Sequence, residues 1–299
     1  MPNIDLLRRF EIPGIVRIDE GRGSLPRVVV TSELASAEIY LHGAHLTSFQ
    51  PRGAGPLLFM SEKSLFDATK PIRGGVPVIF PWFGPKAGAP DSPMHGFARI
   101  RAWELESCTA QTDGSVRVAL RLAGDDATRR LWPHTFDLRM IFDIGRSLEI
   151  EMEVRCGDAP IAFEEALHTY LLVGDVRQVR VDGLENTEYI DKVDSFKRKT
   201  QPNEAIRITG ETDRVYVNTS SACIVRDPVL ERTLTVEKEN SATTVVWNPW
   251  IDKARAMPDF GDEEWPSMIC IETANVGDGA VRLDAGQTHH LRAHLKITE

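Results

Sequence analysis

Apolar and polar residues alternate with a period of two along most of this chain. In the clearest case, two apolar series flank the turn at 143–147 and alternate with polar residues: Phe136, Leu138, Met140 and Phe142, then Leu148, Ile150, Met152 and Val154. Successive side chains of a strand point to opposite faces of a sheet. The pattern therefore predicts an antiparallel hairpin with one buried face and one face in water.

Shorter segments repeat this pattern and are separated by turn residues. The predicted strands are 27–31, 36–41, 46–50, 102–108, 116–122, 161–173, 179–181, 206–208, 215–218, 222–226, 233–238, 243–247, 268–273 and 291–297. A short amphipathic helix is predicted at 4–10 and a helical turn at 61–66. Many short strands without a long helical pattern indicate an all-β sandwich or barrel. Because no linker or internal repeat interrupts the chain, we expect a single domain over residues 1–299.

Composition narrows the class of protein. With 299 residues, 42% of them apolar, the chain can bury a large core, and its net charge of −9 argues against nucleic acid or an anionic membrane as the main partner. No apolar run reaches the ~18 residues of a membrane span, and residues 1–14 lack a signal-peptide pattern. Four widely spaced cysteines fit a reducing compartment. We expect a monomeric cytoplasmic protein that needs no cofactor or metal.

The stretch 71–101 breaks the alternation. Pro77, Pro81 and Pro85 interrupt its apolar residues, and a central strand would reject them because proline cannot donate to the ladder. Arg73 precedes two glycines, and the run His95-Gly-Phe-Ala-Arg99 follows. This stretch is either a kinked edge strand with solvated arginines or a rim that receives an anionic small molecule, since arginine suits phosphate and carboxylate.

Two further segments carry groups that can transfer protons. On a strand at 163–170, His168 shares a face with Glu164, Ala166 and Tyr170. On the strand at 268–273, Glu272 shares a face with Met268 and Cys270. Burial of Glu272 would raise its pKa toward the range of a general base. A satisfied core histidine and a salt-bridged glutamate are the alternative interpretations.

Taken together, five motifs in this order resemble the hexose-6-phosphate mutarotases, also called glucose-6-phosphate 1-epimerases, within the aldose 1-epimerase family. They are Pro71–Gly84, His95–Arg99, Glu165–Tyr170, Val246–Trp250 and Cys270–Ala274. The resemblance implies a large twisted antiparallel β-sandwich of the galactose-mutarotase type, with an open carbohydrate cleft on one sheet. It also implies an isomerase that interconverts the α and β anomers of a hexose 6-phosphate without a cofactor.

The resemblance further assigns roles to particular residues. His168 corresponds to the general acid and Glu272 to the general base. The substrate-binding set corresponds to Arg73, His95, Arg99 and Asp213, with the two arginines expected to serve the phosphate. One position departs from the family pattern, because Met94 stands where a polar residue is frequent.

Other interpretations remain open on the residues alone. A glycoside hydrolase would need a second carboxylate facing Glu272, for which Glu164 is the candidate. A sugar-phosphate-binding or sensing protein without turnover would use the same fold. Three tryptophans are candidates for an apolar floor under the sugar: Trp82, Trp247 and Trp250. The acidic run 259–264 is either an exposed loop or a lid over the sugar.

Two histidine groups could suggest a metal site. His42 and His45 are three residues apart, but on a strand they would point to opposite faces, which favours structural roles. His290 and His294 share a predicted strand face with Arg292, and we interpret that face as polar and solvated, whereas His289 lies on the other. Neither group has the further ligands at the spacing that a zinc site needs.

Overall fold

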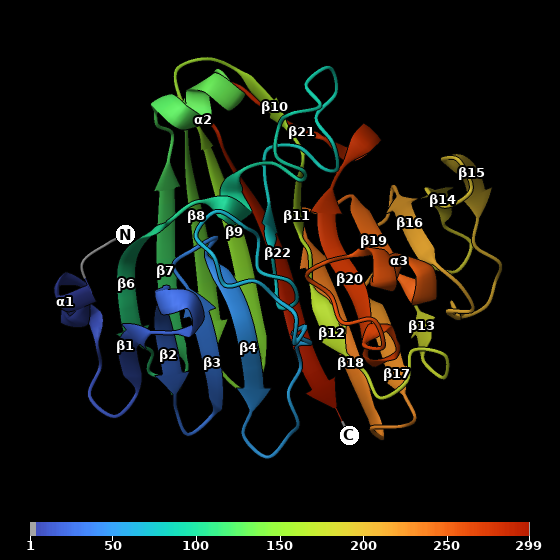
Figure 1. The fold of residues 1–299 in the computed structure, drawn as a ribbon, viewed down its shortest axis with the longest axis horizontal. Helices are drawn as coiled ribbons and strands as arrows, with labels where there is room; N and C mark the ends of the chain where they lie inside the picture. The colour runs from blue at the N-terminus through green and yellow to red at the C-terminus, as the bar shows by residue number, and fades with distance from the viewer. Residues whose placement is uncertain (1–3, 299) are drawn as a thin grey trace.

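Two layers of antiparallel sheet make up the protein in the computed structural model, which describes residues 4–298 (Figure 1). The rear layer is an eight-stranded sheet in the order β13-β17-β18-β22-β9-β8-β7-β6. Its strands are β6 (Glu104–Ala110), β7 (Val116–Ala123), β8 (Phe136–Ile144), β9 (Leu148–Cys156), β13 (Arg180–Asp182), β17 (Cys223–Asp227), β18 (Arg232–Glu239) and β22 (Thr288–Thr298). The predicted all-β sandwich is confirmed.

The front layer combines two sheets. One is four-stranded: β1 (Val16–Glu20), β2 (Pro26–Thr31), β3 (Ala35–Tyr40) and β4 (His45–Pro51). The other, here called the front sheet, has the order β15-β14-β16-β19-β20-β11-β5, with β12 also paired to β20. Its strands are β5 (Val78–Ile79), β11 (Glu165–Leu167), β12 (Tyr170–Leu172), β14 (Glu188–Asp191), β15 (Lys197–Thr200), β16 (Thr212–Val217), β19 (Thr243–Asn248) and β20 (Met268–Asn275). A bridge between Leu46 and Val76 connects the two sheets.

The core lies between the layers, and an aromatic group fixes the irregular segment 80–97 to the rear sheet. Phe80 contacts Trp132, Phe136 and Phe163, with ring centroids 5.3 to 5.4 Å apart, and Phe97 at 6.1 Å. Such aromatic pairs contribute about 0.5–1.5 kcal/mol each beyond burial of their area. Aromatic packing therefore holds the proline-rich stretch in place. Within this stretch only β5 is a strand, and it lies at the edge of the front sheet.

Helices are few and short. They are α1 (Ile4–Leu7) with the 3₁₀ turn η1 (Arg8–Phe10), α2 (Asp126–Leu131), α3 (Trp250–Ala256), and the 3₁₀ turns η2 (Arg22–Ser24), η3 (Ala98–Ile100), η4 (Trp265–Ser267) and η5 (Gly277–Gly279). The predicted helix at 4–10 is confirmed as α1 and η1. The strands β10 (Ile161–Phe163) and β21 (Val281–Leu283) form a separate two-stranded sheet.

Several expectations were wrong. Residues 61–66 form turns and no helix, and 206–208 contribute one bridge, Val181 to Ile206, instead of a strand. The single strand expected at 161–173 is divided into β10, β11 and β12. The segment 251–266, expected to be a loop, contains most of α3.

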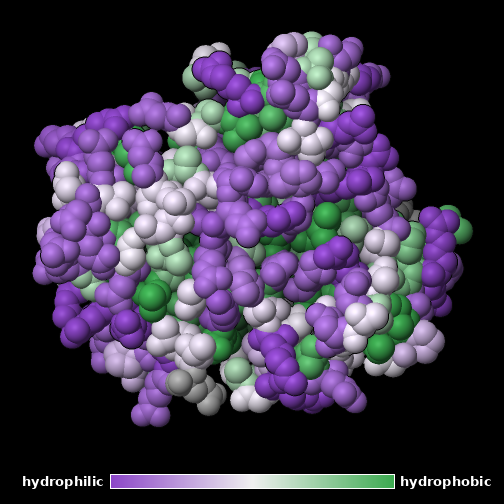
Figure 2. Space-filling model, turned by 180° about the vertical axis from the view of Figure 1, so that it is seen from behind, coloured by the Kyte–Doolittle hydropathy of each residue, from purple (hydrophilic) through white to green (hydrophobic). Residues whose placement is uncertain are grey.

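One hydrophobic cluster runs from Leu7 to Leu295, which favours the prediction of a single domain. That prediction and the expected monomer remain predictions. Seen from behind, the surface is mostly hydrophilic (Figure 2). Within residues 4–298, no helix is long and apolar enough to cross a membrane.

Candidate active site

The front sheet carries a pocket of about 430 Å³ on the face to which Glu272 belongs. All six residues proposed for the site from the sequence line it, and they come from five separate parts of the chain. Its lining residues are Arg73, Phe83, Gly84, Pro85, Met94, His95, Arg99, His168, Lys192, Phe196, Asp213, Trp247, Lys253, Met257 and Glu272. The structure thus brings the six together, whereas their individual roles remain proposals.

Strand register places His168 beside Glu272. β11 and β12 pair with β20 in one continuous register, with Leu167 opposite Thr273 and Tyr170 opposite Cys270. Extending that register by one residue sets His168 opposite Glu272, and directly opposed side chains share a face at about 5 Å between their Cβ atoms. The His168 Nδ1 atom accordingly lies 3.4 Å from Glu272 Oε1. The two groups are neighbours on one surface.

A second row of side chains crosses the same face. Tyr170 on β12 is opposite Cys270 on β20, Cys270 is opposite Trp247 on β19, and Trp247 is opposite Asp213 on β16. The Tyr170 ring stacks on His168 at 4.8 Å with an interplanar angle of 11°, and Trp247 meets His168 edge-on at 5.9 Å. These rings fix the orientation of the His168 imidazole.

Burial shifts both His168 and Glu272 toward their neutral forms. Burial, followed by the charges of Arg73 and Arg99, lowers the pKa of His168 well below 6.5. Burial, followed by the charge of Asp213, raises the pKa of Glu272 well above 4.5. Within the described chain, His168 Nδ1 and Glu272 Oε2 are buried without a hydrogen-bond partner. Both residues therefore carry an unsatisfied polar atom beside the pocket that they line.

Arg73 is held in a fixed position. Gly75, two residues later, has φ +59°, and a Cβ atom there would lie 2.2 Å from the Leu46 carbonyl oxygen. Only glycine fits at this position. The Arg73 Nε and Nη2 atoms donate to Asp259 Oδ2 at 3.2 and 3.1 Å, and Nη1 donates to the Tyr170 hydroxyl at 3.0 Å. Burial opposes the charge, but Tyr170 and Asp259 outweigh it and raise the Arg73 pKa.

The segment His95–Arg99 enters the pocket through a second tight turn. Gly96 has φ +73°, and a Cβ atom there would lie 1.9 Å from the Phe80 carbonyl oxygen. His95 Nδ1 accepts a hydrogen bond from the Gly84 N–H at 3.2 Å. In a neutral imidazole the proton is then on Nε2. Burial, followed by the charge of Arg99, lowers the His95 pKa well below 6.5, so the neutral ring is favoured.

Arg99 differs from Arg73 in its partners. It is 7% exposed, and its Nη2 donates to the Met94 carbonyl oxygen at 2.7 Å. Its Nε is buried without a partner, and none of the ion pairs among residues 4–298 involves it. Burial, followed by the charge of Arg73, lowers the Arg99 pKa to about 10. The guanidinium therefore has no ion-pair partner among residues 4–298, and the carboxylates of Asp259 and Glu272 act on it only at longer range.

Several expectations about this region are corrected. The Arg73 side chain is 20% exposed and Arg99 is 7% exposed, so neither is the freely solvated arginine of the edge-strand interpretation. The acidic run is no free loop, because Asp259 and Phe260 are buried and Glu264 accepts hydrogen bonds from Ser61 and the backbone of residue 62. Of the three tryptophans, only Trp247 is part of the lining.

Glu164 is no partner for Glu272. Its Oε2 accepts from the Phe83 N–H and its Oε1 accepts from the Gly277 N–H, both at 2.7 Å. It is absent from the described lining of the pocket. The glycoside-hydrolase interpretation thereby loses Glu164, its candidate for the second carboxylate.

One charged residue of the pocket, Lys192, was not among those proposed from the sequence. Lys192 lies in the turn after β14, and its Nζ is 3.0 Å from Asp213 Oδ2 and 5.1 Å from the Phe83 ring centroid. A lysine in a polar turn has no sequence signal that separates it from a solvated one. Only its position beside Asp213 in the sheet distinguishes it.

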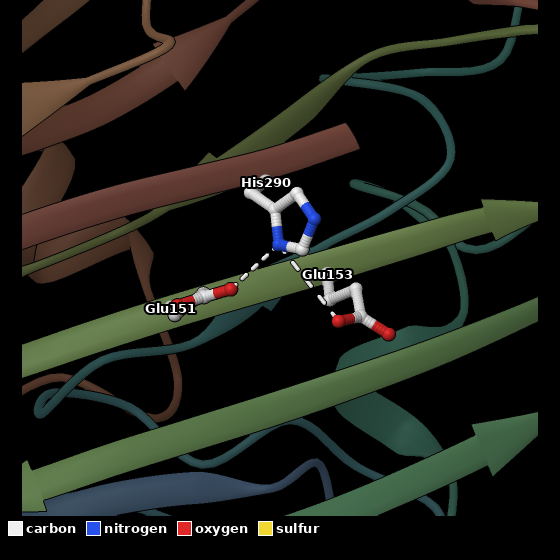
Figure 3. Close-up of side chains that lie close together, drawn as sticks. All are labelled: Glu151, Glu153 and His290. Atoms are coloured by element: carbon white, nitrogen blue, oxygen red, sulfur yellow. Dashed lines mark hydrogen bonds and ion pairs between the residues drawn. The ribbon is translucent and has the colours of Figure 1, made fainter. Parts of the chain in front are cut away.

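The histidines outside the pocket are engaged with the protein. His42 and His45 bond through Nε2 to the carbonyl oxygens of Lys70 at 2.7 Å and Gly74 at 2.8 Å, so the expected structural roles fit. His290 Nδ1 lies 2.6 Å from Glu151 and 3.8 Å from Glu153 (Figure 3). Those carboxylates also pair with arginines 292 and 139, which would compete with a metal ion for them.

Comparison with known proteins places this geometry in a family. A family model described as aldose 1-epimerase matches residues 26–296. A protein of Cenchrus ciliaris named "Putative glucose-6-phosphate 1-epimerase" is 37% identical over 251 residues, which cover 80% of this chain and 75% of that protein.

Solved structures are similar over nearly the whole chain. A structure from Salmonella typhimurium described as a "putative mutarotase" superposes with a TM-score of 0.90 at 30% identity, covering 99% of both chains. A galactose mutarotase related enzyme from Lactobacillus acidophilus superposes with a TM-score of 0.74 at 15% identity, covering 91% of this chain and 97% of that one. The second likeness supports the fold alone.

Proposed function

This chain belongs to the aldose 1-epimerase family, and on that premise we propose that it interconverts the α and β anomers of hexose 6-phosphates, with glucose 6-phosphate as the expected substrate. The proposal joins two features of one pocket: a pair of groups suited to proton transfer, and cationic side chains that a neutral sugar would not require. No metal or cofactor is needed for this reaction.

The observation that carries the proposal is the buried guanidinium of Arg99, which lies in the pocket of His168 and Glu272 and forms no ion pair among residues 4–298. A buried charge without a partner destabilises a protein by several kcal/mol, so it is maintained for a ligand of opposite charge. A phosphate monoester carries roughly −1.5 to −2 charges at neutral pH and offers three acceptor oxygens. Arginine binds such a group with short, charge-assisted hydrogen bonds.

Ring opening requires two proton transfers at adjacent oxygens. Glu272 as carboxylate removes the proton from the anomeric hydroxyl, while protonated His168 donates to the ring oxygen. The aldehyde then rotates about C1–C2, and the ring closes on its other face as His168 takes the proton back and Glu272 returns its own. Because the anomeric and ring oxygens share C1, an acid and a base that are neighbours on one sheet face can serve both.

For the reaction, His168 and Glu272 must share one titratable proton, so that one of them is the acid and the other is the base. In this structure the pKa shifts favour that proton on Glu272, with His168 neutral. A phosphate beside Arg99 offsets part of the positive charge that lowers the His168 pKa. The same offset raises the pKa of Glu272, which the charge of Arg99 lowers, so a bound phosphate favours retention of a proton by the pair.

The test measures anomer exchange by NMR for glucose 6-phosphate and for glucose, with wild type and Arg99→Met. Wild type should accelerate exchange of the phosphorylated sugar far more than that of glucose. Arg99→Met should raise the KM for glucose 6-phosphate by roughly 10- to 150-fold, the equivalent of about 1.5–3 kcal/mol for hydrogen bonds to a charged group.

Equal acceleration of both sugars would remove the phosphate from the proposal and leave a general aldose epimerase. Binding of glucose 6-phosphate without any acceleration would favour a sugar-phosphate-binding protein, for which a proton-transfer pair at 3.4 Å has no use.

A further inference from the structure

We propose that Lys192 is an additional phosphate-binding residue of this pocket, which extends its ammonium from Asp213 to the phosphate of the substrate. This inference rests on the proposed function for the identity of the anion. It adds a residue from the β14–β15 hairpin, a part of the chain that contributes none of the groups assigned above.

Strand register fixes Lys192 next to the reacting groups. β14 pairs with β16 so that Asp191 is opposite Arg214, and the next residue, Lys192, then falls opposite Asp213. The Lys192 N–H donates to the Asp213 carbonyl oxygen at 2.9 Å. Lys192 therefore continues the row of Tyr170, Cys270, Trp247 and Asp213 across a fifth strand position of the same face.

The side chain of Lys192 turns into the pocket. It is 24% exposed, its Nζ lies over the Phe83 ring, and both residues line the cavity. Its positive charge also contributes to lowering the pKa of His95 and of His168. The ammonium thus lies within electrostatic reach of the place where a substrate must bind.

Charge balance calls for a further cation. Of the four cations that line the pocket, Arg73 pairs with Asp259, Lys192 with Asp213 and Lys253 with Glu211, so Arg99 alone brings a positive charge without an ion-pair partner. One positive charge does not balance a phosphate of roughly −1.5 to −2. A second cation has to share the anion.

Lys192 is better placed to supply that cation than Arg73. Asp259 and the Tyr170 hydroxyl occupy three nitrogen atoms of the Arg73 guanidinium, so moving it would leave Asp259 unpaired and buried. An ammonium has three rotatable donors on a flexible stem, and one contact to Asp213 leaves two of them. Lys192 can therefore bind phosphate while it keeps Asp213.

A structural role for Lys192 gives a different expectation. If the lysine only neutralises Asp213, its loss will weaken phosphate binding through the exposed Asp213 charge, and removing that charge as well, in Lys192→Met/Asp213→Asn, will restore it. The phosphate affinity of this double variant therefore separates the two roles.

The experiment compares Lys192→Met with Lys199→Met by calorimetric titration of inorganic phosphate and by KM for glucose 6-phosphate. Lys199 lies on the same hairpin and pairs with Asp191 at 2.8 Å, but it is not part of the described pocket lining, so it controls for disturbance of the hairpin. We expect Lys192→Met to raise the Kd for inorganic phosphate and the KM for glucose 6-phosphate by about tenfold or more. Lys199→Met should change each constant by less than about twofold.

Lys192→Arg should restore most of the phosphate affinity, because it keeps the positive charge. Unchanged phosphate affinity in Lys192→Met, an equal loss in both methionine variants, or affinity restored in Lys192→Met/Asp213→Asn would overturn the proposal. Should the wild type bind phosphate but fail to accelerate exchange of glucose 6-phosphate, the proposed function fails while the titration still decides the role of Lys192.

Discussion

The rear sheet and the front sheet treat polar groups in opposite ways. On the outer face of the rear sheet, charges are exposed and paired: Arg117 bonds to Asp143 at 2.7 and 2.8 Å, and Arg292 to Glu151 at 2.8 Å. Among the described strands of the rear sheet, one residue, Arg232, has a buried side-chain atom without a hydrogen-bond partner. Among those of the front sheet, four residues do: Glu165, Thr244, Glu272 and Thr273.

This difference separates stability from function. Long alternating strands such as β8, β9 and β22 bury apolar side chains on one face and satisfy polar ones on the other, which stabilises the fold. The front sheet uses shorter strands and leaves buried polar atoms unpaired at four residues, which costs stability, and of these four Glu272 lines the pocket. Substitutions in the two sheets should therefore act on different measured quantities.

The largest effect is expected for Glu272→Gln. Loss of a general base lowers the rate by roughly 10²- to 10⁴-fold, while the amide has nearly the same shape as the carboxyl group that it replaces. NMR exchange of glucose 6-phosphate anomers measures the rate, and thermal unfolding measures stability, which should remain close to that of wild type. Activity above about a tenth of wild type would contradict the role of Glu272.

Phe142→Ala tests the other side of the comparison. Phe142 is fully buried on β8 of the rear sheet, and removing its ring should lower the free energy of unfolding by about 3–5 kcal/mol. The rate per folded molecule should stay near wild type when it is measured well below the unfolding transition. Arg117→Ala on the same sheet is the control and should cost less than about 1 kcal/mol. A drop in rate without a drop in stability would show that the two sheets are not separable.

A smaller effect is expected from Asp213→Asn on pH dependence. Burial raises the pKa of Glu272 first, and the negative charge of Asp213 raises it further. Without that charge the Glu272 pKa falls, so Glu272 remains ionised to lower pH. The acidic limb of the kcat–pH profile should therefore move to lower pH, measured at saturating substrate. A limb that stays in place or moves upward would mean that another group controls it.

Much of the fold was predictable because long alternation leaves little ambiguity. The hairpin of β8 and β9 and the strands β7, β18, β19 and β20 follow directly from the order of apolar residues. The strands β14 and β15 were missed, since Lys197–Thr200 contains no apolar residue, and α3 was missed because it has too few apolar residues in helical spacing. The resemblance to the aldose 1-epimerase family is confirmed.

The candidate site was predictable in its residues and not in its arrangement. Alternation predicted that His168 shares a strand face with Tyr170 and that Glu272 shares one with Cys270, and the structure has both arrangements. Which strands are neighbours, and in which register, depends on contacts between distant parts of the chain. The proximity of His168 to Glu272, the pairing of Arg73 with Asp259 and the presence of Lys192 all depend on those contacts, so no local pattern contains them.

The row of side chains across β12, β20, β19, β16 and the end of β14 has a consequence for folding. Its members are separated by up to about 100 positions in the chain, and the arginines at 73 and 99 lie still further from residue 272. Pairing of such distant segments is slow because long loops must close before their contacts form. No fragment of the chain can assemble this pocket, so recovery of activity after dilution from denaturant should coincide with the last step of refolding. Catalytic activity is thus a reporter of the completed topology.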